Sequence, residues 1–216
     1  MITKIFLVRH GESLGNANGM YIGHLNYGLS DFGKLQAEAT AQYLKNEKID
    51  AIYSSDLSRA HDTALPHAKI RNLPVVDSVE LREVNIGEWE GKKIDDLIKN
   101  HYDEFVIGWK QNFGTFAFPG GESVLAAADR FYNEVLAIAK RHIGGSVLIT
   151  AHAAIIRAFW CKVLNIRPEE MAAAVPFPTN ASVSILSFNG EEFLLGDYSM
   201  NKHLEELNNG KNVNNV

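Results

Sequence analysis

Short apolar segments alternate with longer segments of helical periodicity along most of this chain. The strand-like segments are residues 4–8, 50–53, 73–77 and 146–150, and helical patterns follow near residues 31–48, after Ser55 and at 154–164. Such alternation is typical of a mainly parallel sheet with helices on both faces. The sequence therefore predicts an α/β fold, specifically a three-layer α/β/α sandwich with a mainly parallel central sheet.

The middle and the end of the chain depart from this alternation. Residues 94–111 have a helical pattern, residues 112–121 are rich in Phe, Gly and Pro, and a further helix is expected from 122 to about 142. We interpret residues 90–121 as an insertion that forms a partial lid on a single domain of residues 1–207. Residues 182–188 and 192–198 predict a hairpin with a tight turn at Asn189-Gly190, and residues 208–216 a flexible polar tail.

Composition excludes several classes of partner. The net charge of -5, from 26 acidic residues against 21 Lys and Arg, gives no basic field for nucleic acid or an anionic membrane. No run approaches the ~20 apolar residues that cross a bilayer, and the apolar start is too short for a signal peptide. With one cysteine, Cys161, no intrachain disulfide can form, so we expect a cytoplasmic protein. The histidines have no metal-ligand spacing, and we expect no metal.

Charged and polar residues stand where predicted strands end. His10 follows the strand at 4–8, Ser54-Ser55 follow that at 50–53, and His152 follows that at 146–150. In open α/β sheets ligands bind beyond the carboxyl ends of the strands, so these residues can meet in one pocket. Arg9-His10-Gly11 alone is a weak motif, because a histidine at a strand end is more often structural than nucleophilic.

The motif gains weight from distant partners in the sequence. Together these segments resemble the histidine phosphatase superfamily, also called the phosphoglycerate mutase-like or RHG family, over residues 6–188. The resemblance is carried by Arg9-His10-Gly11, Asn16, Gly33, Gln36-Ala37, Arg59-Ala60, Thr63-Ala64, Glu83, Trp89-Glu90-Gly91, Gly120-Gly121-Glu122-Ser123 and His152.

The resemblance implies a role for each matching residue. His10 is the nucleophile, Arg9, Arg59 and His152 form the phosphate pocket, and Glu83 is the proton donor. The residue types suit a phosphate monoester, because a phosphate carries about -1.5 to -2 charges and the planar arginine fork donates two parallel hydrogen bonds to it. Side-chain cations then serve where a metal otherwise would, and no cofactor is implied.

Four further residues lie on the segment that follows His10. Asn16 either donates to a phosphate oxygen or caps a turn, and both alternatives stay open. Tyr21, Gly23 and His24 are candidates for contact with the substrate. The aromatic residues of the insertion, from Trp109 to Phe118, close a satellite core or form an apolar lid over the pocket.

We expect a phosphohydrolase acting on a small-molecule phosphate ester through a phosphohistidine. Mutases that resemble glycolytic phosphoglycerate mutase carry adjacent arginines in the insertion, and this chain has no arginine between Arg82 and Arg130. Phosphoglycerate-mutase-type transfer is the alternative, followed by a catalytically silent binding module, and a homodimer is left open. Two departures from the family pattern are Ala153-Ala154 after His152 and Tyr27-Gly28 before Leu29.

Overall fold

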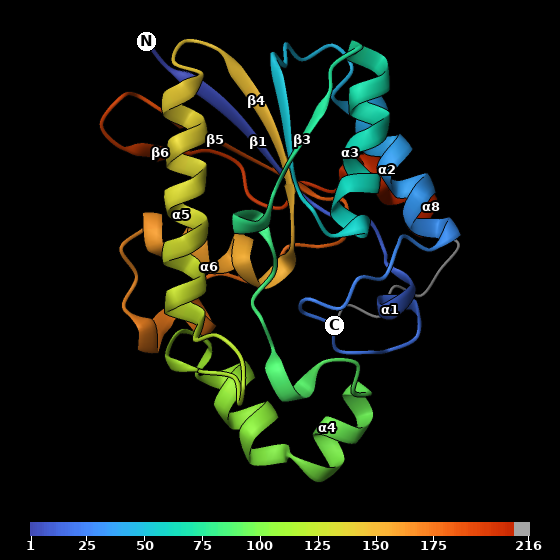
Figure 1. Ribbon diagram of the computed structural model, residues 1–216, viewed down its shortest axis with the longest axis vertical. Helices are drawn as coiled ribbons and strands as arrows, with labels where there is room; N and C mark the ends of the chain where they lie inside the picture. Colours follow the sequence, from blue (N-terminus) through green and yellow to red (C-terminus); the bar gives the residue numbers. More distant parts are fainter. Residues whose placement is uncertain (210–216) are drawn as a thin grey trace.

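A six-stranded sheet runs through the centre of the computed structural model, which describes residues 1–209 (Figure 1). The strand order is β3-β2-β4-β1-β5-β6. Strands β1 to β4 pair in parallel, whereas β5 is antiparallel to β1 and to β6. The strands are β1 Thr3–Arg9, β2 Ala51–Ser55, β3 Val75–Ser78, β4 Ser146–Ala151, β5 Val183–Phe188 and β6 Phe193–Leu195.

Helices cover both faces of this sheet. Figure 1 shows α5 and α6 on one side and α2 and α3, with α8 nearby, on the other. Residues 87–89, 113–115 and some other short connections form 3₁₀ turns. The α-helices are α1 Leu14–Ala17, α2 Asp31–Tyr43, α3 Ser58–Arg71, α4 Ile94–Asn100, α5 Val124–Arg141, α6 Ala153–Val163, α7 Met171–Ala174 and α8 Glu205–Asn208.

Successive residues of β1 belong to two different cores. Ile5 and Leu7 pack in the cluster that includes the α5 and α6 side chains, and Phe6 and Val8 pack in the cluster with α3. Side chains alternate between the faces of a strand, so a strand buried on both faces must be apolar at nearly every position. The predicted three-layer α/β/α sandwich is confirmed.

Residues 94–111 are helical as predicted, except at His101, where the segment divides into two helices of different winding. Helix α4 ends before His101, whose backbone (φ -136°, ψ 40°) leaves the helical region, and residues Asp103–Gln111 form a π-helix. The spacing of apolar residues cannot distinguish an α-helix from a π-helix here. Phe105 and Trp109 lie four positions apart and are buried, and either kind of helix would place them on one face. Figure 1 shows this green segment beyond one end of the sheet.

The hairpin at the end of the sheet also differs from its prediction. Strand β6 spans only Phe193–Leu195, and Phe188 pairs with Phe193, so the turn contains residues 189–192 instead of two residues. The Oδ1 atom of Asn189 accepts hydrogen bonds from the N–H groups of Glu191 and Glu192 at 2.8 and 2.9 Å, and these bonds stabilise the wider turn. Of the tail predicted at 208–216, residues 210–216 lie outside the described chain.

Candidate active site

His10 stands at the carboxyl end of β1, beside the end of β4. Arg9 pairs with Ala151 in the parallel register, so His10 and His152 follow their strands at the same level, with ring centres 5.2 Å apart. The Nδ1–H group of His10 donates to the carbonyl oxygen of Gly11 at 2.7 Å. Because that acceptor fixes the tautomer, the Nε2 lone pair of His10 is free to attack a ligand.

The turn after His10 requires glycines. A Cβ atom on Gly11 would lie 2.5 Å from the carbonyl oxygen of Gly33, and one on Gly33 would lie 2.0 Å from the carbonyl oxygen of Glu12. The N–H group of Gly11 donates to the Thr63 hydroxyl of α3 at 3.0 Å. The loop thus packs backbone to backbone on α2 and is hydrogen-bonded to a side chain of α3, and these contacts hold the turn that carries His10 in place.

Electrostatics keep His10 neutral. Burial, followed by the positive charges of Arg59 and Arg9, lowers the pKa of His10 well below its usual value of 6.5. A buried imidazole between two guanidinium groups cannot readily accept a proton. At neutral pH His10 therefore carries the lone pair that a nucleophile needs.

The two arginines are held by backbone carbonyl groups. Arg9 donates from Nη1 to Pro178 at 2.6 Å, and Arg59 donates to Gly23 at 2.7 Å and to Leu25 at 3.0 Å. Burial lowers the pKa of each to about 10, although the negative charge of Glu83 opposes this effect. Both remain positively charged at neutral pH and keep N–H groups for a ligand.

His152 is completely buried beside His10. Burial, with Arg59 as the next cause, lowers its pKa well below 6.5. Within residues 1–209 neither ring nitrogen of His152 has a hydrogen-bond partner. An unpartnered buried polar group of this kind calls for an explanation, and contact with a bound oxyanion supplies one.

Glu83 lies at the N-terminus of α6. Its carboxylate accepts hydrogen bonds from the N–H groups of Val84 at 3.0 Å, Ala154 at 3.0 Å and Ile155 at 2.9 Å. The first turn of a helix presents unpaired N–H groups and a positive partial charge, so a carboxylate is favoured there. In this way the start of α6 fixes the Glu83 carboxylate.

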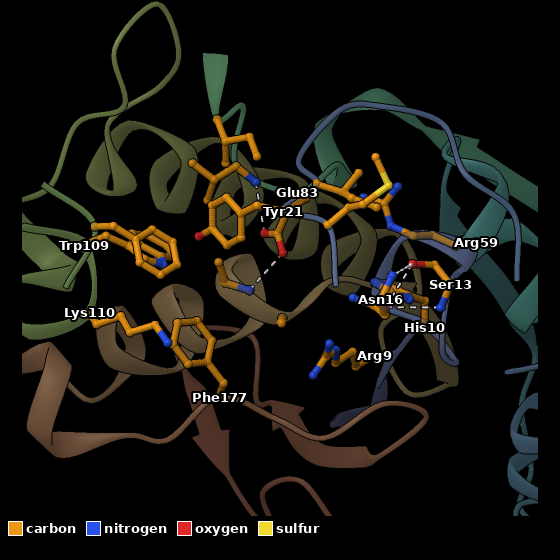
Figure 2. A pocket seen from close by; sticks show the side chains of 17 residues that line it. Arg9, His10, Ser13, Asn16, Tyr21, Arg59, Glu83, Trp109, Lys110 and Phe177 are labelled. Atoms are coloured by element: carbon orange, nitrogen blue, oxygen red, sulfur yellow. Dashed lines mark hydrogen bonds between the residues drawn. The ribbon is translucent and has the colours of Figure 1, made fainter. Parts of the chain in front are cut away.

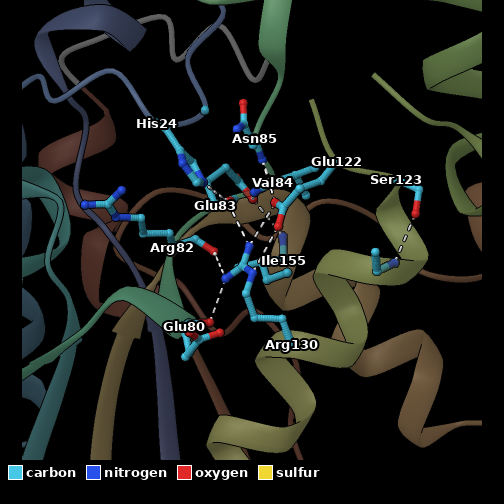
Figure 3. Close-up of polar contacts among 12 residues, drawn as sticks. His24, Glu80, Arg82, Glu83, Val84, Asn85, Glu122, Ser123, Arg130 and Ile155 are labelled. Atoms are coloured by element: carbon cyan, nitrogen blue, oxygen red, sulfur yellow. Dashed lines mark hydrogen bonds and ion pairs between the residues drawn. The ribbon is translucent and has the colours of Figure 1, made fainter. Parts of the chain in front are cut away.

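A network around Arg130 supports the backbone of Glu83 (Figure 3). Arg130 of α5 donates to the carbonyl oxygens of Glu80, Arg82 and Glu83 and to both carboxylate oxygens of Glu122. Burial acts to raise the pKa of Glu122, but hydrogen bonds from Arg130 and the Asn85 N–H group make the net shift downward. Sequence reasoning missed Arg130, whose role follows from tertiary contacts alone.

Arg9, His10, Arg59 and Glu83 line a cavity, whereas His152 is not among its lining residues (Figure 2). Figure 2 shows His10, Arg59 and Asn16 at one end, Trp109, Lys110 and Phe177 at the other, and Glu83 between them. The cavity is lined by Arg9, His10, Ser13, Asn16, Met20, Tyr21, Ile22, Arg59, Glu83, Val84, Ile86, Phe105, Trp109, Lys110, Ala153, Ala154 and Phe177.

Two of the four additional candidates line the cavity. Asn16 accepts through Oδ1 from the N–H and hydroxyl groups of Ser13, at 3.1 and 2.9 Å, so its Nδ2 group is the one left to donate to a ligand. Tyr21 lies among the rings of the aromatic end, and its ring centre is 5.4 Å from that of Phe105. Gly23 and His24 lie behind the wall, where the Gly23 carbonyl holds Arg59 and His24 donates to the Glu83 carbonyl at 2.8 Å.

The aromatic end contains residues that sequence reasoning did not single out. Lys110, Phe105 and Phe177 all line the cavity. A π-helical turn takes in more residues than the ~3.6 of an α-helix, so positions i, i+4 and i+5 share a face, as Phe105, Trp109 and Lys110 do here. No sequence pattern distinguishes this winding.

Two further properties concern the part of the chain that the structure describes. There, no helix is long and apolar enough to cross a membrane. No group of three or more His, Cys, Asp or Glu side chains in residues 1–209 is arranged to hold a metal ion.

Comparison with known proteins identifies the family. Residues 5–200 match the histidine phosphatase superfamily (branch 1). The chain belongs to this superfamily. It is 32% identical over 207 residues to phosphoserine phosphatase 1 of Hydrogenobacter thermophilus, covering 95% of this chain and 96% of that protein.

Two other histidine phosphatases are similarly close. A metal-independent phosphoserine phosphatase of Arabidopsis thaliana is 31% identical, over 95% of this chain and 85% of its own length. The structure of mycobacterial glucosyl-3-phosphoglycerate phosphatase matches with a TM-score of 0.84 and 26% identity, covering 93% of this chain and 100% of that chain. The predicted family and fold are thereby confirmed.

Proposed function

We propose that this histidine phosphatase hydrolyses small-molecule phosphate monoesters through a phosphohistidine on His10. The observation that carries the proposal is the neutral His10, whose Nδ1–H group is fixed on Gly11 and whose ring lies between Arg9 and Arg59. Phosphoryl transfer depends mostly on positioning and on neutralising the phosphate oxygens. The charged end of the cavity meets both requirements.

Two displacements at phosphorus make up the proposed reaction. The Nε2 lone pair of His10 attacks phosphorus and the bond to the ester oxygen breaks. The Glu83 carboxylate takes up the proton that the bound monoester carries and passes it to the leaving oxygen. Water then attacks the phosphohistidine, its proton passes to the Glu83 carboxylate, and the P–N bond breaks. Arg9, Arg59, His152 and the Nδ2 group of Asn16 hold the phosphate oxygens in both steps.

The far end of the cavity suggests a substrate with a second anionic group. Lys110 lines the cavity there, and within residues 1–209 its ammonium group makes no ion pair and lies 5.2 Å from the Phe105 ring centre. Phosphoserine and glucosyl-3-phosphoglycerate appear in the names of two relatives, and both compounds are phosphate monoesters that carry a carboxylate. We therefore propose a phosphorylated small acid, with its carboxylate near Lys110.

A mutase would need a second phosphate site, and the cavity lining argues against one. The lining residues opposite His10 are mostly apolar or aromatic, and Lys110 is the cation among them. A single exposed lysine is a weak site for a second phosphate compared with the arginines around His10. Hydrolysis is therefore favoured over transfer.

The experiment is a phosphate-release assay in EDTA on phosphoserine, 3-phosphoglycerate, glycerol phosphate and p-nitrophenyl phosphate. We expect free phosphate from each, fastest from a carboxylate-bearing ester. Activity that appears only after metal is added back would contradict the mechanism. Conversion of 3-phosphoglycerate to its isomer with no loss of organic phosphate would establish the mutase instead.

A trapping experiment tests the covalent step. After rapid quenching, a phosphate that is stable in base and labile in acid is expected on His10. If the quenched protein carries no such phosphate under single-turnover conditions, water attacks the ester directly and the phosphohistidine must be abandoned.

A further inference from the structure

The loop of residues 23–25 contacts the site from outside the cavity. It lies behind Arg59 and Glu83 and does not belong to the cavity lining. Its three N–H groups and two of its carbonyl groups nevertheless all bind charged side chains. The loop therefore links the Glu90 carboxylate, bound by its N–H groups, to the Arg59 guanidinium, bound by its carbonyl groups.

The N–H side of this loop binds a single carboxylate, that of Glu90. Gly23 donates to Oε2 at 3.1 Å, Leu25 donates to Oε2 at 3.2 Å, and His24 donates to Oε1 in a shorter bond. Hydrogen bonds to an ionised acceptor are stronger than those between neutral groups. A neutral amide in place of this carboxylate would put an NH₂ group against N–H donors.

The carbonyl side of the loop binds Arg59. The Gly23 carbonyl accepts from Nη2 at 2.7 Å and the Leu25 carbonyl accepts from Nη1 at 3.0 Å. The Gly23 carbonyl and the His24 N–H group belong to one peptide unit, so this unit connects the Glu90 carboxylate directly to the Arg59 guanidinium. Hydrogen bonds in such a chain polarise and strengthen one another.

The backbone must approach closely for these contacts to form. A Cβ atom on Gly23 would lie 2.5 Å from the carbonyl oxygen of Val84 and 2.7 Å from Oε1 of Glu90. Next in the chain, the Oδ1 atom of Asn26 accepts from the N–H group of Ser58 at 2.7 Å, which fixes the loop on the first turn of α3. Arg59 is the following residue of that turn.

Charge also connects the two side chains. Burial lowers the pKa of Arg59, and the negative charges of Glu83 and then Glu90 act in the opposite direction. A buried cation needs such compensation, and Glu90 supplies it without occupying the guanidinium N–H groups directly.

We propose that Glu90 is a positioning residue for phosphate binding, acting through the loop of residues 23–25 on Arg59. Its carboxylate binds the N–H groups of three successive peptide units, one of which carries the Gly23 carbonyl. The loop so oriented holds the guanidinium through the Gly23 and Leu25 carbonyl groups and leaves its other N–H groups to the phosphate. This role rests on the proposed function only in that phosphate is the ligand of Arg59.

The test compares Glu90→Gln with Glu88→Gln, an exposed glutamate of the same Gly-Glu-Trp-Glu-Gly motif. The dissociation constant of inorganic phosphate is measured by calorimetry, together with kcat, KM and Tm. Loss of charge-assisted bonds predicts about tenfold weaker phosphate binding in Glu90→Gln. Glu88→Gln is expected to stay within about twofold of the wild type.

A double-mutant cycle with Arg59→Ala separates positioning from general stability. If Glu90 acts through Arg59, adding Glu90→Gln to Arg59→Ala changes the phosphate affinity by less than about twofold. Additive losses, or a lower Tm with unchanged phosphate affinity, would overturn the proposal. If Glu90→Gln does not fold, Glu90→Asp keeps the charge on a shorter side chain, and phosphate affinity equal to the wild type would overturn it equally.

Phosphate binding also keeps this proposal distinguishable from the proposed function. A wild-type protein that binds phosphate but hydrolyses no monoester would refute the phosphatase reaction, while a tenfold loss in Glu90→Gln would still support the positioning role.

Discussion

The two ends of the cavity are built in different ways. At the charged end, Arg9 and His10 extend from the end of β1 and Arg59 from the start of α3, while Glu83 lies on a connecting segment and is held by the start of α6. Each of the four makes a hydrogen bond with backbone N–H or carbonyl groups. At the aromatic end, Trp109 and Lys110 belong to a π-helical insertion and are positioned by ring contacts. The residues proposed for the phosphoryl transfer, which tolerates little displacement, are thus held by the sheet and its flanking helices. The contacts that would select a substrate lie on an irregular segment.

Arginine has opposite roles at the two ends. Arg157 of α6 donates to the carbonyl oxygens of Val175, Met171 and Ala172, and its guanidinium lies 4.3 Å from the ring centres of both Phe113 and Phe177. These contacts hold the Arg157 guanidinium against the aromatic wall. Arg9 and Arg59 instead keep N–H groups for a ligand, and the following changes test this contrast in order of expected effect.

The largest effect is expected at the charged end, for His10→Ala. Loss of the nucleophile should lower kcat by roughly 10⁴- to 10⁶-fold, as for other covalent catalysts. Phosphate release from p-nitrophenyl phosphate in EDTA measures it. His101→Ala, in the insertion and outside the cavity lining, is the control and should be near wild type. Substantial activity in His10→Ala would place the nucleophile elsewhere.

Glu83→Gln should show the next largest effect, and one that depends on the leaving group. A positioned proton donor contributes ~10²–10⁴-fold, and an alcohol needs the proton more than a nitrophenolate does. The kcat for glycerol phosphate should therefore fall much further than that for p-nitrophenyl phosphate. An equal loss on both esters would indicate that Glu83 serves only to hold α6 and its neighbours.

The contrast between the ends also explains what the sequence could predict. Strands buried on both faces are nearly uniformly apolar, so the runs before His10 and His152 indicated the sheet and which residues end its strands. Arg59 and Glu83 followed only from the family resemblance. Contacts between distant segments leave no local pattern, and Arg130, Lys110 and Phe177 were missed for that reason.

For Asn16, the sequence predicted two possible roles but could not show whether one side chain can have both. The spacing of Ser13 and Asn16 is that of a capping box, and the structure contains both reciprocal bonds, but the same side chain also lines the cavity. The two alternatives that the sequence left open are therefore compatible. Only the arrangement of Oδ1 and Nδ2 in space could show this.

Acid stability tests the effect of burial apart from the cavity. Burial, followed by Arg71, lowers the pKa of His67 from 6.5 to about 3 in the folded protein. Below pH 6.5 His67 binds a proton in the unfolded chain but not in the folded protein. The stability that depends on a neutral His67 is therefore fully present above pH 6.5 and is lost as the pH falls toward 3. The free energy of unfolding should drop by about 2 kcal/mol from His67 alone between pH 7.5 and pH 5.

Urea unfolding at the two pH values measures this drop. His67→Leu should reduce the difference by about 2 kcal/mol, and the remainder reports His10 and His152, whose pKa values are shifted in the same direction. Activity at pH 7.5 should be unchanged, because His67 does not line the cavity. An unchanged pH dependence in His67→Leu would show that the folded protein admits a proton at this buried site.

The smallest effect is expected at the aromatic end, for Lys110→Met. An exposed ion pair is worth about 0.2–1 kcal/mol, so KM for phosphoserine should rise by at most about fivefold, while KM for p-nitrophenyl phosphate stays unchanged. Added salt should shrink the difference, because it screens exposed charges. Lys99→Met, on α4 and outside the lining, is the matched control. Equal changes on both esters would assign Lys110 to general attraction of anions and remove the carboxylate from the proposed substrate.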